Sequence, residues 1–141
     1  MISITVLVID DDSDFSRLVK FVLEYDTNWK ILTASNGETG LTKARSQQPS
    51  IILLDMVMPG LDGLEVYYLL KSNPITRSIP IIFVTAMVSM EKIIKLQITE
   101  DIQVITKPFD ILTLKNQVIN ACDRYLDVRS QIRLAFLNGM P

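Results

Sequence analysis

Five short runs rich in isoleucine, valine and leucine recur along this chain, and each is followed by a segment long enough for a helix. The runs cover residues 4–9, 30–34, 51–54, 80–84 and 102–105. Continuous apolar runs, unlike alternating ones, are typical of strands covered on both faces, as in a parallel sheet with helices on each side. We therefore predict an α/β fold built on a five-stranded parallel sheet.

The polarity of the runs predicts their order in the sheet. Residues 4–9, 51–54 and 80–84 are the most apolar and are placed at the centre. The run at 30–34 opens with Lys30 and the run at 102–105 contains Gln103, so both suit the edges. The resulting order is 2-1-3-4-5, which is the doubly wound, flavodoxin-like arrangement.

Helix starts and apolar faces are also readable from the sequence. Asp12 or Ser13, Asp62 and Asp110 can cap the first, third and last helices. The predicted apolar stripe of the first helix is Phe15, Leu18, Val19, Val22 and Leu23, and the fourth helix offers Met90, Ile93, Ile94 and Leu96 to the sheet.

Composition limits the class of protein. A chain of 141 residues with 48% hydrophobic residues can form one domain with a substantial core. The net charge of -2, with 14 scattered basic residues, argues against direct binding of nucleic acid. A single cysteine excludes an internal disulfide, and neither a signal peptide nor an apolar run of about 18 residues is present. We expect a cytoplasmic protein that does not enter the membrane.

Polar residues stand at the carboxyl ends of four predicted strands. Asp10 and Asp11 follow the first, Asp55 ends the third, Thr85 follows the fourth and Lys107 follows the fifth. These ends share one edge of a parallel sheet, and ligands bind there beside the point where the strand order reverses. An acidic run after a strand is usually only a solvated turn with a helix cap. The combination of four strand ends instead predicts a binding site.

Carboxylates on neighbouring strands about 4.8 Å apart would repel one another. A divalent cation held by oxygens, most simply Mg²⁺ or Mn²⁺, would offset that repulsion. The acidic residues therefore predict a metal site, with Lys107 as a second cation nearby.

Several segments of the chain resemble the receiver domain of two-component response regulators, the CheY-like family. They are "VLVIDDD" (6–12), "TASNGETGL" (33–41), "PSIILLDMVMPGLDGLEV" (49–66), "IPIIFVTA" (79–86) and "ITKPF" (105–109). The resemblance extends from residue 4 to about residue 123, and the segment around Asp55 is the most specific. It implies the CheY-like version of the predicted fold.

The resemblance also assigns roles to site residues by position. It implies that Asp55 accepts a phosphoryl group and that Thr85 and Lys107 contact that group. The metal ligands it implies are Asp10, Asp11, Asp55 and the backbone carbonyl of Val57, with Asp11 favoured over Asp10 as a direct ligand. It implies no enzyme activity beyond the domain's own aspartyl phosphorylation and dephosphorylation.

The resemblance implies partners as well. The chain contains no histidine, so a separate sensor histidine kinase or phosphotransfer protein is expected as the phosphoryl donor. A small donor such as acetyl phosphate could also serve. Phosphorylation would then switch binding to a downstream target protein.

Departures from the family pattern leave alternatives open. Val104 stands where the family has a switching aromatic residue, and Glu100 and Asp101 replace a pair of small residues. The resemblance implies that the side chains of Val57 and Met87 flank the path of hydrolytic water, and because both are apolar we predict slow self-dephosphorylation. One alternative is a degenerate receiver that binds partners regardless of phosphorylation. Another is a Mg²⁺-dependent phosphatase or phosphotransferase acting on small molecules, which normally has a carboxylate where Val57 stands.

The predicted division is a receiver at 1–123 and a C-terminal extension at 124–141 that continues the last helix. Because the extension is too short for an output domain, we expect a stand-alone receiver. Apolar residues of the last helix and the extension are spaced alternately by four and three, which fits a dimerising helix. Alternatively, the first three of them pack on the sheet and the remainder is a loosely docked extension. The residues with this spacing are Leu114, Val118, Ala121, Tyr125, Val128, Ile132 and Ala135.

Overall fold

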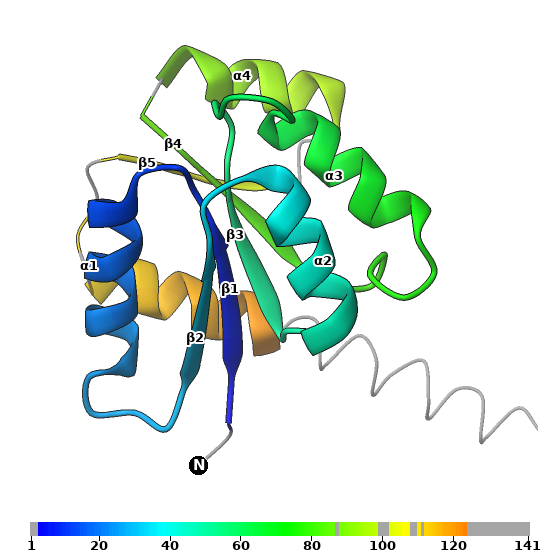
Figure 1. Ribbon diagram of the computed structural model, residues 1–141. Helices are drawn as coiled ribbons and strands as arrows, with labels where there is room; N and C mark the ends of the chain where they lie inside the picture. The colour runs from blue at the N-terminus through cyan, green and yellow to red at the C-terminus, as the bar shows by residue number, and fades with distance from the viewer. Residues whose placement is uncertain (1–2, 87, 99–101, 108–109, 111, 124–141) are drawn as a thin grey trace, which may run out of the picture.

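A five-stranded parallel sheet forms the centre of the protein (Figure 1). The computed structural model describes residues 3–123 except 87, 99–101, 108–109 and 111. The strands are β1 (Thr5–Ile9), β2 (Lys30–Ala34), β3 (Ile51–Asp55), β4 (Ile81–Thr85) and β5 (Gln103–Thr106). Their order is β2-β1-β3-β4-β5 and every neighbouring pair is parallel, which confirms the predicted topology.

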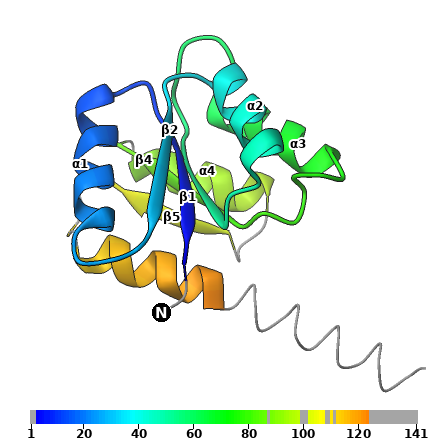
Figure 2. The ribbon, with the colours of Figure 1, turned by 60° about the horizontal axis from the view of Figure 1, so that its bottom comes forward.

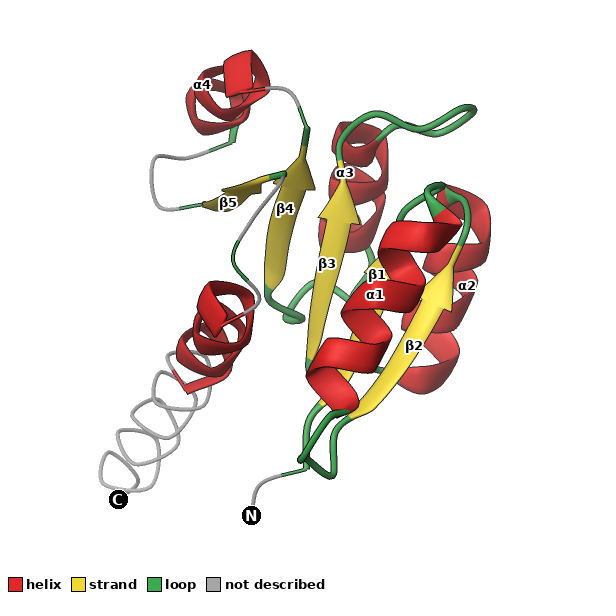
Figure 3. Cartoon of the chain, turned by 90° about the vertical axis from the view of Figure 1, so that its left-hand side faces the viewer, coloured by secondary structure: helices red, strands yellow, loops and turns green. Residues whose placement is uncertain are grey.

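Helices cover both faces of the sheet (Figures 2 and 3). They are α1 (Ser13–Glu24), α2 (Gly37–Gln47), α3 (Gly63–Ser72), α4 (Val88–Gln97) and a last helix over residues 112–123. Helix α1 and the last helix lie on one face, while α2, α3 and α4 lie on the other. This arrangement explains the continuous apolar strands, because both of their faces are buried.

Two hydrophobic cores lie on opposite faces of the sheet. Val8 and Leu53 point toward the first, where Val19 of α1 and Leu114 and Val118 of the last helix meet them. Alternate strand residues point toward the second core, which contains Ile9, Leu54 and Phe83 with Val66 of α3 and Ile94 of α4. The cores hold the strands in register and so fix where the strand ends lie.

Side-chain caps define where the helices begin. The carboxylate of Asp12 accepts hydrogen bonds from the backbone N–H groups of Asp14 and Phe15. Asp62 and Glu65 form a reciprocal capping box at the start of α3. Asp110 accepts from the backbone N–H of Leu112 at 2.8 Å. The predicted caps are thus confirmed, with Asp12 rather than Ser13 capping α1.

The predicted apolar face of α1 is partly wrong. The helix buries Ser16, Val19 and Leu23, whereas Leu18 is 51% exposed. The buried residues follow the helical spacing of three and four, so the sheet-facing stripe includes a serine and leaves Leu18 outside it.

The prediction for α4 is also partly wrong. Ile94 is fully buried and Met90 packs at the margin of the second core, but Ile93 is 42% exposed. The side chain of Leu96 lies outside the described residues.

The residues with the predicted coiled-coil spacing fall into two groups. Leu114, Val118 and Ala121 are buried in the first core, which confirms the alternative that they pack on the sheet and leaves them unavailable to a dimer seam. The remaining residues of the seam lie outside the described residues, as does the whole 124–141 extension. The division at residue 123 and the dimerising role of the extension therefore stay predictions.

Candidate functional site

The register of the strands brings the polar strand ends to one edge. Ile9 pairs with Leu54, so Asp10 continues β1 beside Asp55. Asp55 in turn pairs with Val84, the residue before Thr85. On the far side Thr85 pairs with Thr106, which precedes Lys107. The predicted convergence of these four strand ends is confirmed, and we call this side of the sheet the carboxyl edge.

Three carboxylates meet at the carboxyl edge. One oxygen from each of Asp10, Asp11 and Asp55 lies within 4.8 Å of the others. Asp10 and Asp55 are buried, at 2% and 7% exposure, while Asp11 is exposed. The cluster therefore has a buried floor and one carboxylate open to solvent.

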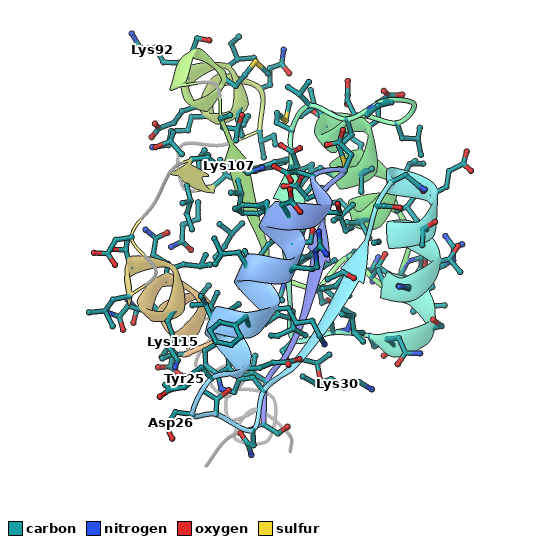
Figure 4. The ribbon with its side chains drawn as sticks, turned by 60° about the vertical axis from the view of Figure 1, so that its left-hand side comes forward. Tyr25, Asp26, Lys30, Lys92, Lys107 and Lys115 are labelled. Carbon is teal, nitrogen blue, oxygen red and sulfur yellow. The ribbon has the colours of Figure 1, made fainter. Side chains whose placement is uncertain are left out.

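Asp10 is held by two hydrogen bonds that use both of its oxygens. Its Oδ1 accepts from the backbone N–H of Asp12 at 2.9 Å, and its Oδ2 accepts from Lys107 Nζ at 2.7 Å. Lys107 is itself fixed through its backbone N–H, which donates to the carbonyl of Thr85 at 2.7 Å. Figure 4 shows Lys107 at the end of β5, higher in this view than α1.

The surroundings of Asp55 disfavour its charged form. Burial is the main cause and the nearby charge of Asp10 is the second; together they raise the pKa of Asp55 to about 7. The charge of Lys107 and hydrogen bonds from the backbone at Val57 and Met56 act in the opposite direction. A cation placed among the carboxylates would therefore favour the ionised form of Asp55.

The turn after β3 holds Asp55 through a close backbone approach. Gly63 donates its backbone N–H to the carbonyl of Met56 at 2.9 Å. A Cβ at position 63 would overlap the carbonyl oxygen of Asp55 and lie 2.7 Å from Met56 Cα. Glycine is needed here for space, so the sequence "GLDG" after the strand contributes directly to the site.

The structure describes three of the other predicted site residues, Thr85, Val57 and Val104. Thr85 is buried at the end of β4, and the Val57 side chain is 54% exposed beside Asp55. Val104 is half-buried against the second core. Met87, Glu100 and Asp101 lie outside the described residues. The metal-binding role of the Val57 carbonyl stays a prediction.

The sequence interpretation missed one residue of the site. Phe15 was assigned only to the apolar stripe of α1, yet Lys107 Nζ lies 4.0 Å from the centroid of its ring. That distance is well within the range of a cation–π interaction. No local pattern indicated the contact, because it joins the first turn of α1 to the end of β5.

The donor set fits a hard divalent cation. Oxygens bound to one Mg²⁺ at about 2.0–2.1 Å lie up to roughly 4 Å apart, so small side-chain rotations would bring the three carboxylates to one ion. Asp10 would either release Lys107 and bind the ion directly or bind the ion through a water molecule, since Mg²⁺ usually keeps several waters.

Within the part of the chain that the structure describes, no helix is both long enough and apolar enough to span a bilayer.

Comparisons with known proteins agree on the family. The family model described as the response regulator receiver domain matches residues 6–119. The probable transcriptional regulatory protein TcrX of Mycobacterium tuberculosis is 35% identical over 109 residues, covering 77% of this chain and 45% of that protein. The alkaline phosphatase synthesis transcriptional regulatory protein PhoP of Bacillus subtilis is 35% identical over 105 residues, covering 74% of this chain and 42% of that protein.

A solved structure supports the same assignment. The chemotaxis protein CheY4 of Vibrio cholerae superposes with a TM-score of 0.75 at 25% identity, covering 85% of this chain and 99% of that one. The chain spans less than half of the length of TcrX and PhoP. With its parallel sheet in the order 2-1-3-4-5 and its acidic carboxyl edge, this chain belongs to the CheY-like receiver domains of two-component response regulators.

Proposed function

We propose that this receiver accepts a phosphoryl group on Asp55 in a Mg²⁺-dependent reaction and thereby switches its binding to other proteins. The observation that carries the proposal is the convergence of Asp10, Asp11 and Asp55 within 4.8 Å, with Lys107 held on Asp10. Such a set can both place a nucleophile and offset the charge of a phosphoryl group.

The proposed donor is a phosphohistidine of a sensor histidine kinase or a phosphotransfer protein, since this chain contains no histidine. A carboxylate oxygen of Asp55 forms a bond to phosphorus as the P–N bond of the donor breaks. The imidazole nitrogen keeps the electron pair of that bond and takes up a proton. The product is an acyl phosphate on Asp55, a known form of covalent catalysis.

The other residues stabilise the group in transfer. Asp10, Asp11, Asp55 and the Val57 carbonyl would hold the cation, which supplies charge neutralisation to the phosphoryl oxygens. Lys107 contributes an ammonium group from the side of β5, and the Thr85 hydroxyl contributes a hydrogen bond from the end of β4. The ionised form of Asp55 that attack requires is favoured once a cation joins the cluster.

The proposal limits catalysis to the domain's own phosphorylation and dephosphorylation. The proposed output is a change in the binding of a downstream target protein. Val104 cannot act as an aromatic switch, so the conformational change that reaches the target has to use other residues.

Mass spectrometry after treatment with acetyl phosphate and Mg²⁺ tests the proposal. The wild-type protein should gain the mass of one phosphoryl group on Asp55, and Asp55→Asn should gain none. Asp12→Asn is a matched control, because it removes one neighbouring carboxylate while asparagine still caps α1. It should be phosphorylated like the wild type.

Other outcomes point to the alternatives. A wild-type protein that gains no phosphoryl group would favour a receiver that binds partners independently of phosphorylation. Release of inorganic phosphate in repeated turnover without any labelled protein would favour a phosphatase.

A further inference from the structure

The ammonium group of Lys107 lies between two unlike partners. On one side is the Asp10 carboxylate, with Oδ2 at 2.7 Å; on the other is the face of the Phe15 ring, whose centroid is at 4.0 Å. The Lys107 side chain is only 17% exposed, so both contacts are partly shielded from water. Shielding strengthens a cation–π interaction relative to an exposed one.

The backbone of the β1–α1 turn fixes the position of the ring. Asp10 accepts a hydrogen bond from the N–H of Asp12, and the Asp12 carboxylate accepts from the N–H of Phe15 at 3.1 Å. Phe15 also packs at the margin of the first core. The same short turn therefore places both the carboxylate and the ring that contact Lys107.

The two contacts respond differently to a bound cation. A divalent cation held by the acidic cluster would compete with Lys107 for Asp10 and would repel the ammonium group, because both are positive. The ring carries no net charge, and its negative face attracts the ammonium in either case. Phe15 can thus keep Lys107 at the carboxyl edge after Asp10 is committed to the metal.

We propose that Phe15 is a positioning residue that holds the Lys107 ammonium over the carboxyl edge for interaction with the phosphoryl group. This inference rests on the proposed phosphorylation of Asp55. It predicts that phosphorylation reaches its full rate only with an aromatic ring at position 15, and that an apolar side chain without a ring gives a slower reaction.

The test compares Phe15→Leu with Phe15→Tyr, which keeps the ring. At saturating Mg²⁺, Phe15→Leu should be phosphorylated by acetyl phosphate about fivefold more slowly than the wild type, a loss typical of one partly shielded cation–π contact. Phe15→Tyr should stay within about twofold of the wild type. Thermal unfolding of each variant shows whether it is folded at the assay temperature.

A second measurement reports the contact without any phosphorylation. In NMR spectra, the ε-methylene protons of Lys107 should be shifted upfield by the ring current in the wild type and in Phe15→Tyr, with and without Mg²⁺. The shift should be absent in Phe15→Leu. A loss of packing alone would not produce this pattern.

The outcomes are separable. Equal phosphorylation rates for Phe15→Leu and the wild type, equally slow rates for the leucine and tyrosine variants, or no upfield shift in the wild type would each overturn the role of Phe15 while the proposed function stands. A wild-type protein that is never phosphorylated would overturn the proposed function and, with it, the role of Phe15 in transfer.

Discussion

The two ends of the same parallel sheet bury opposite kinds of side chain. The carboxyl edge buries Asp10, Asp55 and Thr85. The opposite side, which we call the amino edge, surrounds a cavity of about 770 Å³ lined partly by Trp29, Ile79 and several prolines. In Figure 1 the amino edge lies beside the N-terminus and the carboxyl edge lies at the other end of the strands.

If the carboxyl edge has the proposed function, this contrast separates the residues that stabilise the fold from those that react. Buried apolar side chains stabilise the fold, whereas buried carboxylates near one another destabilise it unless a cation is present. The carboxyl edge can be poised for chemistry because the rest of each strand is anchored in the two cores. Substitutions at the two edges should therefore have different consequences.

The largest expected effect is on stability, at the amino edge. Trp29 is 9% exposed and belongs to the first core, so Trp29→Ala should lower the free energy of unfolding by about 3–5 kcal/mol. Urea unfolding followed by circular dichroism measures this change, because Trp29 is the only tryptophan and its fluorescence is lost in the variant. Trp29→Phe, which keeps an aromatic ring, should lower the free energy of unfolding by less.

The same variant tests the separation of the two edges. At a temperature where Trp29→Ala is folded, its phosphorylation by acetyl phosphate should match that of the wild type. A large loss of phosphorylation in the folded variant would contradict the comparison.

The next effect is on the pH dependence of stability at the carboxyl edge. The folded state raises the pKa of Asp55 from 3.8 to about 7, so the fold favours the protonated carboxyl. The stabilisation that the protonated Asp55 carboxyl contributes is fully present below about pH 4 and should be lost as the pH rises through about 7. Without divalent cations, Asp55→Asn should be more stable than the wild type by roughly 2–4 kcal/mol at pH 8, and nearly equal to it at pH 4.

Urea unfolding of both proteins at pH 4 and pH 8 measures that difference. Added Mg²⁺ should stabilise the wild type more than Asp55→Asn at pH 8. A stability difference that does not change with pH would show that burial of the Asp55 charge is not its cause.

A smaller loss of stability is expected from the turn after β3. Gly63→Ala should lower the free energy of unfolding by about 2–3 kcal/mol, because the added Cβ meets the backbone of Asp55 and Met56. Thermal unfolding measures the loss, and mass spectrometry after acetyl phosphate treatment should show reduced labelling of Asp55.

Gly60→Ala is the matched control for this turn. Gly60 has a φ of +75°, and apart from the glycine and its two chain neighbours no described atom lies within 4 Å of the place that an added Cβ would take. Alanine there should therefore cost only about 1 kcal/mol through backbone strain. It should leave the labelling of Asp55 intact. Equal losses from both variants would argue against close packing at Gly63.

The smallest expected effect concerns the lifetime of the proposed acyl phosphate on Asp55. The exposed side chain of Val57 cannot orient water by hydrogen bonding. One added hydrogen bond is worth about 1 kcal/mol, so Val57→Asn should hydrolyse the acyl phosphate roughly fivefold faster. Val57→Ile keeps the site apolar and should behave like the wild type. Loss of the phosphoryl mass with time measures both, and a slower reaction in Val57→Asn would refute the idea.

Much of the carboxyl edge was predictable because strand ends are local features of the sequence. The apolar runs located the strands, and the polarity of Lys30 and Gln103 placed two of them at the edges. Once the order was known, Asp10, Asp55, Thr85 and Lys107 had to meet at one edge. The cap at Asp62 was equally local, because it depends on the three residues that follow it.

Side-chain direction on helices was predicted less well. Leu18 and Ile93 were assigned to buried faces on the basis of their apolar character, yet both are substantially exposed. Apolar residues adjacent to a buried stripe fit the helical period almost as well as the stripe itself. The docking angle of the helix on the sheet decides between them.

Short-range patterns in the chain were enough to define the strands, their order, and the set of polar residues that the order brings together, because a parallel sheet aligns its strand ends. The pairing of Lys107 with Asp10, 97 residues away, and the Phe15 ring over the same ammonium group emerged only from the folded arrangement. The burial of Leu114, Val118 and Ala121 in the first core decided between two interpretations that their spacing had left open. These contacts depend on how helices pack against the sheet, and that packing joins residues with no local relation in the chain.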